Sequence, residues 1–513
     1  MMNGKEQDSI TLCVVGGGTA GWLSAMIFQS EAKRQGCEVH IVLIESSKIP
    51  TIGVGEGTTS IFGGVLQALG ISQSEFLVKT DATIKYGIRH KDWRFVGHSY
   101  DGPIDDPYAL SDTIPNAGSW IDTFCVAAGR SVGEPHLFQA LMKSNKAPVA
   151  IQNGRPVALS QFHHAYHFDQ AKVGVFLRQK SQGITHIDAT VTDVTHDPEN
   201  GRLTSLILDN GDKVTADFFI DCTGFSRRLI GQAMGVPWKS YGDILPVNRA
   251  MPFWIDLPQD DIPTYTLAWA QSSGWMWQIP TQERMGCGYV FSDRHLTPDQ
   301  AQAEIETTLG MPITPRADIK MDAGRLDRVW DKNVLALGLA SSFLEPLEAT
   351  SIHGTIVSVL LFCNRYLSKL NTISDQERMA YNQAIAGQVD DFCDFINLHY
   401  VSERQDSAFW RDVANEYIQL KTREKIAAWQ SKMPASDDFI NALDGLPHVE
   451  DLLHYPVLDG LGLLNQAVAR QVMSQNPNFR NFARDTVDHL SKQAKLLAAQ
   501  AMSHKDWLKS LHQ

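Results

Sequence analysis

The sequence has little cysteine, no long apolar run and no excess of positive charge, and each absence excludes a class of protein. Its seven cysteines show no C-x-x-C pair, and their odd number argues against a complete disulfide framework. No run of about 18 apolar residues appears, which argues against a transmembrane helix. The polar opening MMNGKEQDSI shows no signal-peptide pattern. These features predict a cytoplasmic protein with reduced cysteines.

Acidic residues outnumber basic ones in this chain as a whole. The 513 residues include 58 Asp and Glu but 45 Lys and Arg, which gives a formal net charge of −13. This balance argues against broad electrostatic binding to nucleic acid or to anionic membranes. Apolar residues at 43% and charged residues at 20% are typical of a globular protein. The length predicts a large core and more than one structural unit.

The first sixty residues predict a dinucleotide-binding unit. An apolar run at 11–15 predicts a strand that leads into a G-x-G-x-x-G motif and a helical stretch at 22–28. A second strand at 39–44 ends at Glu45, close to the interval expected for a ribose-binding acid. The plainer alternative is a glycine-rich turn with an incidental glutamate. Besides Glu45, the predicted cofactor residues of this unit are Gly16, Gly18, Thr19, Ala20 and Gly21.

Two further segments favour a flavin over a nicotinamide cofactor. A second glycine-rich loop at 53–59 follows the acid closely and suits a large cofactor. Much later, residues 216–224 are similar to the strand and turn that close the dinucleotide domain of many FAD enzymes. An ordinary turn is the alternative for this second segment. The flavin interpretation predicts a cofactor domain assembled from distant parts of the chain.

The segment Gly274–Pro280 places two tryptophans one residue apart, ahead of an Ile-Pro pair. In a strand, residues i and i+2 point to the same side, so Trp275 and Trp277 would form one aromatic wall. Alone, such a pair is more often part of a core than of a site. Beside a flavin, the wall would keep an organic substrate away from the isoalloxazine ring.

The glycine motif together with Trp275-x-Trp277-x-Ile279-Pro280 resembles the flavin-dependent halogenases of the tryptophan-halogenase type. The resemblance covers nearly the whole chain. Three more segments are similar to family segments, namely residues 81–93, 342–352 and 399–411. The fold that this resemblance implies is α/β, with an FAD-binding, Rossmann-like domain of the aromatic-hydroxylase type, a sheet-rich substrate portion and a C-terminal helical subdomain.

The resemblance also implies roles for individual residues. It places the family's active-site lysine on Lys85, the active-site glutamate on Glu348, and the halide-binding backbone on Thr350 and Ser351. Trp275, Trp277, Ile279 and Pro280 become the partition motif. Further FAD contacts fall on Val191, Leu339 and Ile352.

The implied reaction begins with FADH2, which a separate NAD(P)H-dependent flavin reductase delivers. Oxygen and a chloride or bromide ion then yield hypohalous acid at the flavin. Lys85 either forms a haloamine or donates a hydrogen bond to the hypohalous acid, and Glu348 positions this species or accepts the ring proton. The acceptor is a small electron-rich aromatic, such as an indole or a tryptophan derivative. The sequence leaves the oligomeric state open, with a homodimer as one alternative.

Other interpretations of these residues remain. Lys85 precedes a charged cluster at 89–94 that would ordinarily face water, and Glu348 could be a helix-start acid stabilised by the helix dipole. The family's Ser-Thr-Gly is Ala349-Thr350-Ser351 here, and we expect Ser351 to restrict φ beside the halide. Bromide preference is therefore a live hypothesis. Residues 451–462 keep one tyrosine where a tryptophan clamp would have more aromatics.

Two other functions stay open. An FAD-dependent aromatic monooxygenase shares the glycine loop but needs its substrate next to the ring, where the tryptophan wall stands. A non-catalytic protein that binds reduced flavin would need neither Lys85 nor Glu348. The predicted organisation is an FAD and substrate portion over residues 1–355, with loops near 98–131 over the active site, and a helical substrate-covering subdomain over 356–513.

Overall fold

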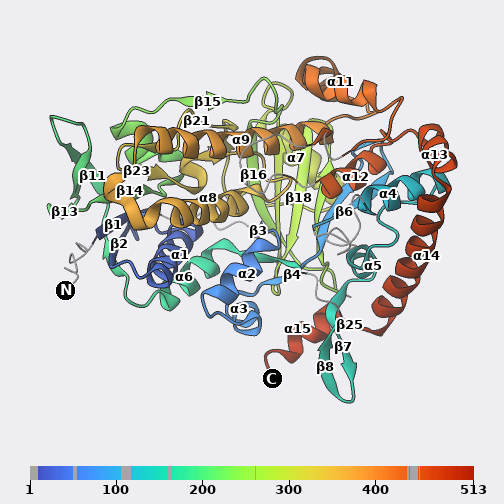
Figure 1. The fold of residues 1–513 in the computed structure, drawn as a ribbon, viewed down its shortest axis with the longest axis horizontal. Helices are drawn as coiled ribbons and strands as arrows, with labels where there is room; N and C mark the ends of the chain where they lie inside the picture. Colours follow the sequence, from blue (N-terminus) through green and yellow to red (C-terminus); the bar gives the residue numbers. More distant parts are fainter. Residues whose placement is uncertain are drawn as a thin grey trace.

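The computed structural model describes residues 10–49, 55–104, 117–159, 163–259, 261–435, 438–439, 449 and 451–513. Figure 1 shows two large sheets side by side with long helices laid across them. The glycine-rich loop predicted at 53–59 begins outside the described residues, and the part from Gly55 onward is described.

The first sheet is the predicted dinucleotide-binding sheet. Its order is β10-β2-β1-β14-β23-β22, and all its pairings are parallel except that of β22 with β23. β14 pairs directly with β1, which confirms that the segment near 216–224 joins the N-terminal unit. The buried apolar runs are typical of parallel strands covered on both faces. The strands are β1 (Ile10–Val15), β2 (Val39–Glu45), β10 (Thr185–Asp188), β14 (Phe218–Asp221), β22 (Trp330–Asp331) and β23 (Val334–Ala336).

The second sheet has seven strands in the order β20-β16-β19-β18-β17-β5-β6. Helix α7 (Pro298–Leu309) buries Ala301 and Ile305 against one face. The other face carries the tryptophans of β18 and packs against the C-terminal helices. The strands are β5 (Gly87–Lys91), β6 (Ser99–Pro103), β16 (Arg249–Ile255), β17 (Tyr265–Ala270), β18 (Gly274–Pro280), β19 (Met285–Phe291) and β20 (Ile319–Lys320).

A three-stranded sheet, β3-β9-β4, lies beside the second sheet and carries Lys85 at the end of β4. Three further small sheets are β11-β12-β13, β15-β21-β24 and β25-β7-β8. The strands are β3 (Gly55–Gly57), β4 (Thr83–Lys85), β7 (Lys146–Gln152), β8 (Arg155–Ala158), β9 (Ala165–Asp169), β11 (Val191–His196), β12 (Leu203–Leu208), β13 (Lys213–Thr215), β15 (Trp238–Ser240), β21 (Gly324–Leu326), β24 (Ser342–Phe343) and β25 (Ala501–Ser503).

Helices dominate the chain after residue 349. The predicted boundary at 355/356 falls inside α8, which packs against α1 of the first sheet. α14 runs along α4 and α5, at the right of Figure 1, and β25 returns to pair with β7. The helices are α1 (Thr19–Gln35), α2 (Ile61–Ala68), α3 (Gln73–Thr80), α4 (Ala117–Ala128), α5 (Leu137–Lys143), α6 (Gln170–Lys180), α8 (Thr350–Tyr366), α9 (Asp375–His399), α10 (Ala408–Asp412), α11 (Leu420–Ala428), α12 (Asp451–Gly460), α13 (Gln466–Gln475), α14 (Pro477–Gln500) and α15 (His504–Ser510).

The prediction of loops over 98–131 was wrong for much of that segment. Residues 99–103 form strand β6, which pairs with β5, and residues 117–128 form helix α4. The glycines and aspartates suggested turns, but pairing to β5 and packing against α13 and α14 override that local preference. Residues 105–116 lie outside the described residues.

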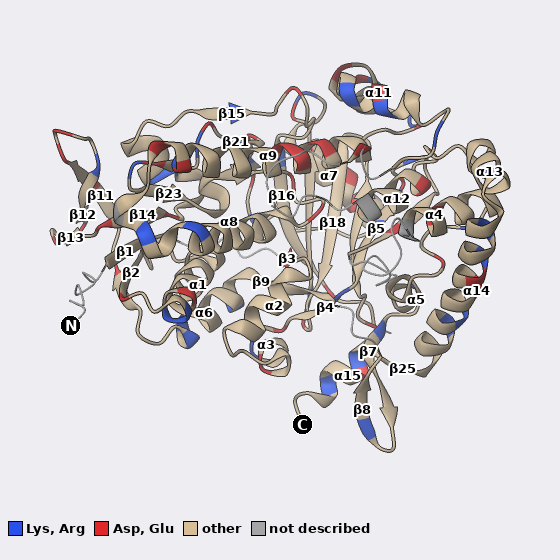
Figure 2. Cartoon of the chain, viewed as in Figure 1, with Lys and Arg blue, Asp and Glu red and all other residues tan. Residues whose placement is uncertain are grey.

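Charged residues gather on the helices and connecting segments, while the strands of the second sheet are mostly uncharged (Figure 2). Among the described residues, no single helix is long and apolar enough to cross a membrane. One bent pair, α2 with α3, meets the length and composition criteria only when the two helices are taken together.

Candidate active site

The glycine motif forms the turn between β1 and α1. Gly16 has φ 109°, and a Cβ there would lie 2.2 Å from the Cys222 carbonyl oxygen of the neighbouring turn. A Cβ on Gly21 would lie 1.8 Å from the Gly16 carbonyl oxygen, so glycine allows helix and turn to pack closely. A Cβ on Gly18, the N-cap of α1, would meet open space. The first turn of α1 has no side-chain cap, which leaves its amides available to a pyrophosphate.

Glu45 and the turn that holds Leu339 lie next to the glycine turn. Glu45 ends β2, and its carboxylate contacts His186 at 3.0 Å and Arg178 at 3.4 Å. Val191 is the first residue of β11. In the short segment between β10 and β11, the Ala189 amide donates to the Glu45 carbonyl. Leu339 lies in a 3-10 turn, Gly338–Ala340, that packs against the first turn of α1.

Strand β18 confirms the predicted alternation of the two tryptophans. The ring centroids of Trp275 and Trp277 lie 6.4 Å apart on one face of the sheet, and both side chains are buried. Trp277 lies flat over Gly288 of β19, where a Cβ would come within 2.0 Å of its ring. Ile279 faces Gly55 of β3, so the wall lies next to the small sheet that holds Lys85.

Lys85 is buried, with a side chain only 1% exposed. Its Nζ donates to the Thr58 carbonyl at 3.0 Å, and Thr59 contacts His353 of α8 at 2.9 Å. Burial lowers the pKa of Lys85 from 10.5 to about 8, and the charge of Glu348 opposes this shift. The solvated alternative for Lys85 is therefore wrong. A substantial share of its amine is neutral near physiological pH.

Glu348 lies in the turn that precedes α8 and faces two histidines. Its Oε1 lies 2.9 Å from His399 Nε2 and 3.6 Å from His90 Nε2. Burial alone would raise the pKa of Glu348, but the contacts with His399 and His90 outweigh it and lower that pKa. No ion pair within 4.0 Å joins Glu348 to Lys85 in the described part of the chain. Glu348 therefore acts on Lys85 through the electric field rather than by contact.

Helix α8 begins at Thr350, so Thr350, Ser351 and Ile352 form its first turn. Ala349, the N-cap, has no side-chain acceptor and leaves the first amides of this 17-residue helix uncapped. These amides and the positive end of the helix dipole suit a small anion. They open into a pocket lined also by Gly338, Leu344 and Phe392.

A buried carboxylate joins the wall to the Glu348 turn. Glu345 Oε2 accepts hydrogen bonds at 2.6 Å from both Trp275 Nε1 and the Tyr400 hydroxyl. Burial raises the pKa of Glu345 to about 7, although these two hydrogen bonds oppose the rise. Glu345 and Glu348 lie three residues apart in one turn, so the network holds the turn against β18.

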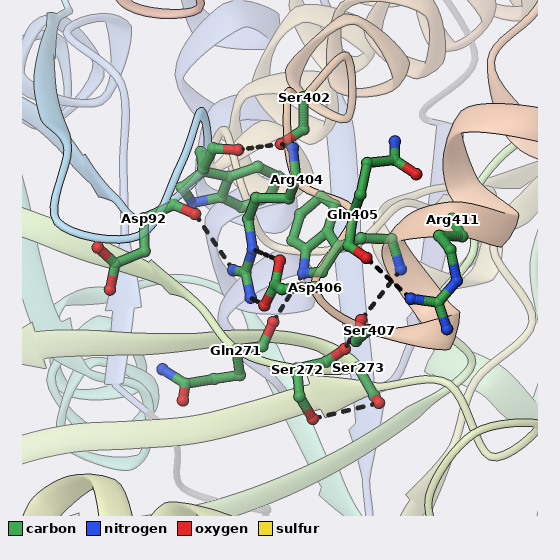
Figure 3. Close-up of polar contacts among 12 residues, drawn as sticks. Asp92, Gln271, Ser272, Ser273, Ser402, Arg404, Gln405, Asp406, Ser407 and Arg411 are labelled. Atoms are coloured by element: carbon green, nitrogen blue, oxygen red, sulfur yellow. Dashed lines mark hydrogen bonds and ion pairs between the residues drawn. The ribbon is translucent and has the colours of Figure 1, made fainter.

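The segment after α9 is joined by polar contacts to the residue after β5 and to the turn before β18 (Figure 3). Arg404 pairs with Asp406 at 2.8 Å and donates to the Asp92 carbonyl at 3.2 Å. Ser407 donates to the Ser272 carbonyl at 2.6 Å, in the turn that leads into β18. Two tethers, one to the end of β5 and one to the β17–β18 turn, thus fix the end of α9 over the tryptophan wall.

Known proteins match this chain over almost its entire length. The tryptophan halogenase family model matches residues 11–474. A tryptophan 6-halogenase of Streptomyces toxytricini is 30% identical, over 97% of this chain and 99% of the relative. The chain belongs to the tryptophan halogenase family. A tryptophan 7-halogenase of Lentzea aerocolonigenes is 31% identical, over 89% of this chain and 90% of the relative.

Solved structures of flavin-dependent halogenases have the same fold as this chain. A flavin-dependent halogenase from Brevundimonas sp. BAL3 superposes with a TM-score of 0.82 at 29% identity, over 99% of this chain and 100% of that one. A flavin-dependent halogenase from Xanthomonas campestris gives 0.84 at 28% identity, over 98% of both chains. This protein is a flavin-dependent halogenase that uses FAD and a halide. The open space at Gly18 and the uncapped first turn of α1 fit the dinucleotide part of FAD.

The structure corrects the expectation that Ser351 restricts the backbone at the predicted halide site. Ser351 lies within helix α8, so its backbone is not restricted there. The left-handed residue is Ala349, with φ 54°, at the helix start. The conformational cost therefore falls two residues earlier than the sequence indicated, and the φ argument for bromide loses its basis.

Sequence reasoning did not assign His90, His399, Glu345 or Tyr400 any role in the halogenase. His90 was grouped with a charged cluster expected to face water, yet it is 1% exposed. The alternation of β5 carried the missing signal, because Ile88 and His90 share the buried face while Arg89 and Lys91 do not.

Proposed function

We propose that Lys85 and Glu348 of this halogenase transfer an oxidised halogen to a small electron-rich aromatic of the indole type. The observation that carries this proposal is the burial of the Lys85 amine, which is 1% exposed and donates to the Thr58 carbonyl in the small sheet that packs against β18. An amine without its proton is a nucleophile that can accept a halogen cation, and the same group in its protonated form can donate to hypohalous acid.

Residues of the β1–α1 turn would hold FADH2, which would give two electrons to oxygen, and the oxygen would take two more from the halide, so that halide, oxygen and a proton yield hypohalous acid and water. Amides of Thr350 and Ser351 hold the halide at the positive end of α8. Trp275 and Trp277 close the space between this helix start and the substrate, and Glu345 holds Trp275 by its indole N–H. The wall thereby keeps the organic substrate from the flavin and separates halogenation from hydroxylation.

Glu348 completes the transfer. Its lowered pKa keeps the carboxylate ionised at neutral pH, so its charge stabilises a cationic ring intermediate. After the halogen has added to the ring, the carboxylate accepts the ring proton, and His399 and His90 hold its orientation.

A cavity of about 730 Å³ supports a small aromatic substrate. Tyr100 and Asp101 of β6, Arg130 and Gln139 line it from one side, and Asp459 of α12 lines it from the other. Its volume lies within the range of ordinary ligand pockets. The Tyr100 ring stacks on His90 with centroids 4.6 Å apart, which connects the cavity to the Glu348 cluster.

The test uses purified protein with FAD, a generic NADH-dependent flavin reductase, bromide or chloride, and a panel of indoles and phenols. Halogen isotope patterns in the product mass spectrum support the proposal. Omitting the reductase and supplying chemically reduced FAD tests whether reduced flavin comes from outside. A hydroxylated product without halogen would instead support a monooxygenase.

Two variants assign the roles. Lys85→Ala and Glu348→Gln are expected to bind FAD and lose halogenated product, whereas Lys492→Ala, at an exposed position of α14, keeps it. Persistent product from Lys85→Ala contradicts the proposed transfer through Lys85.

A further inference from the structure

Three metal-binding side chains converge at the turn before α8. The donor atoms of His90, Glu348 and His399 all lie within 4.8 Å of one another. Both imidazoles are buried, at 1% and 0% exposure, while the Glu348 side chain keeps 18%. They come from β5, the turn before α8 and the end of α9, so only the fold brings them together.

The imidazole nitrogens of this cluster meet no hydrogen-bond donor from the described chain. His399 Nδ1 lies 2.7 Å from the Phe395 carbonyl and therefore carries a proton, so in the neutral ring Nε2 offers its lone pair toward Glu348. Neither nitrogen of His90 makes a hydrogen bond within the described chain. His399 Nε2 lies 2.9 Å from Glu348 Oε1 but makes no hydrogen bond of regular geometry there. A buried His90 ring whose two nitrogens lack hydrogen-bond partners requires an explanation.

The geometry suits a divalent transition metal. Bonds of about 2.0–2.2 Å to imidazole nitrogen and carboxylate oxygen place tetrahedral donors about 3.3 Å apart. The observed Oε1–Nε2 separations of 2.9 and 3.6 Å bracket that spacing. The Nδ1–H contact with a backbone carbonyl is the outer hydrogen bond that metal-bound histidines ordinarily make. Stacking on Tyr100 holds the His90 ring, with 9° between the two planes.

We propose that His90, Glu348 and His399 form a binding site for a divalent transition-metal ion of the zinc class, with water in the remaining position. The exposed part of Glu348 gives the ion access. Binding withdraws the Glu348 carboxylate from halogen transfer, so the ion inhibits the enzyme. This second step rests on the proposed function; metal binding itself does not.

The test measures binding without flavin or substrate. Chelator-treated protein is titrated with Zn²⁺ against a chromogenic chelator, and Co²⁺ is added separately to record its visible bands. We expect one ion per chain and bands of a four-coordinate site. His90→Phe keeps an aromatic ring beside Tyr100 but removes both nitrogens, and should weaken Zn²⁺ binding by about 100-fold or more. The control His295→Asn alters a histidine paired with Asp412 outside the cluster and should not change it.

Inhibition is read in a second experiment. Zn²⁺ should suppress halogenation by the unaltered enzyme, and added chelator should restore it. The Zn²⁺ concentration that halves the activity of the unaltered enzyme should match the dissociation constant from the titration. Absence of stoichiometric binding overturns the proposal and leaves an imidazolium–carboxylate pair as the state of the cluster. Binding that His90→Phe and Glu348→Gln retain also overturns it. Binding without inhibition refutes the regulatory step, while an inactive but metal-binding enzyme refutes the proposed function alone.

Discussion

Replacing Lys85 by methionine should change how the stability of the protein depends on pH. The folded protein holds this amine with a pKa of about 8, whereas the unfolded chain has the ordinary 10.5. Between these values the unfolded chain binds more protons, so the free energy of unfolding rises with pH. The contribution of the Lys85 amine to the free energy of unfolding is complete above pH 10.5, the pKa in the unfolded chain. It is lost as the pH falls through about 8, the pKa in the folded protein. Lys85→Met removes this dependence.

The magnitude follows from the pKa difference. Each pKa unit corresponds to about 1.36 kcal/mol, so lowering the pKa from 10.5 to about 8 amounts to about 3.4 kcal/mol in full. As the pH rises from about 7 to about 9.5, the free energy of unfolding gains about 2 kcal/mol of this amount. The unaltered protein should therefore gain about 2 kcal/mol relative to Lys85→Met over this interval.

Urea unfolding at the two pH values, followed by tryptophan fluorescence, measures this difference. Lys492→Met serves as the control, because Lys492 is exposed on α14. Titration of all other groups cancels between protein and variant. A difference between the unaltered protein and Lys85→Met that stays constant within about 0.5 kcal/mol refutes the lowered pKa, and with it the partly neutral amine on which halogen transfer depends.

Three further predictions concern the same site. Gly57→Ala places a Cβ 3.2 Å from Lys85 Nζ, and we expect it to displace the amine and lower product formation by about tenfold or more while FAD binding persists; normal turnover would show that the position of Nζ is not critical. Glu345→Ala leaves the Trp275 and Tyr400 donors unpaired and should lower the free energy of unfolding by about 2–6 kcal/mol, whereas Glu345→Gln keeps an acceptor and should lose less than about 1.5 kcal/mol; equal losses in urea unfolding would contradict this. Ser351→Gly should change the bromide-to-chloride product ratio by less than about twofold in equimolar competition, because Ser351 already has helical backbone; a larger change would show that the residue type at this position affects halide choice.

Several features of the site were predictable because they are local. The order of strand, glycines, helix, strand and acid predicted the β1–α1–β2 unit, since Gly16 and Gly21 each meet backbone atoms that leave no room for a Cβ, within a few residues of the chain or at one neighbouring turn. The spacing of Trp275 and Trp277 predicted their shared face, because alternation is a property of any strand. Lys85 was found through the family resemblance, while its burial was not visible in the charged residues that follow it.

The sequence by itself determined which chemical groups are available and which local shapes they take: a pyrophosphate loop, an aromatic strand, a lysine and a glutamate. The tertiary structure alone decided their electrostatic state. Packing of the small sheet removes water from Lys85 and lowers its pKa, and the end of α9 brings His399 to Glu348 while β5 brings His90. Such effects depend on dielectric surroundings and on contacts between elements far apart in the chain, which no local pattern records.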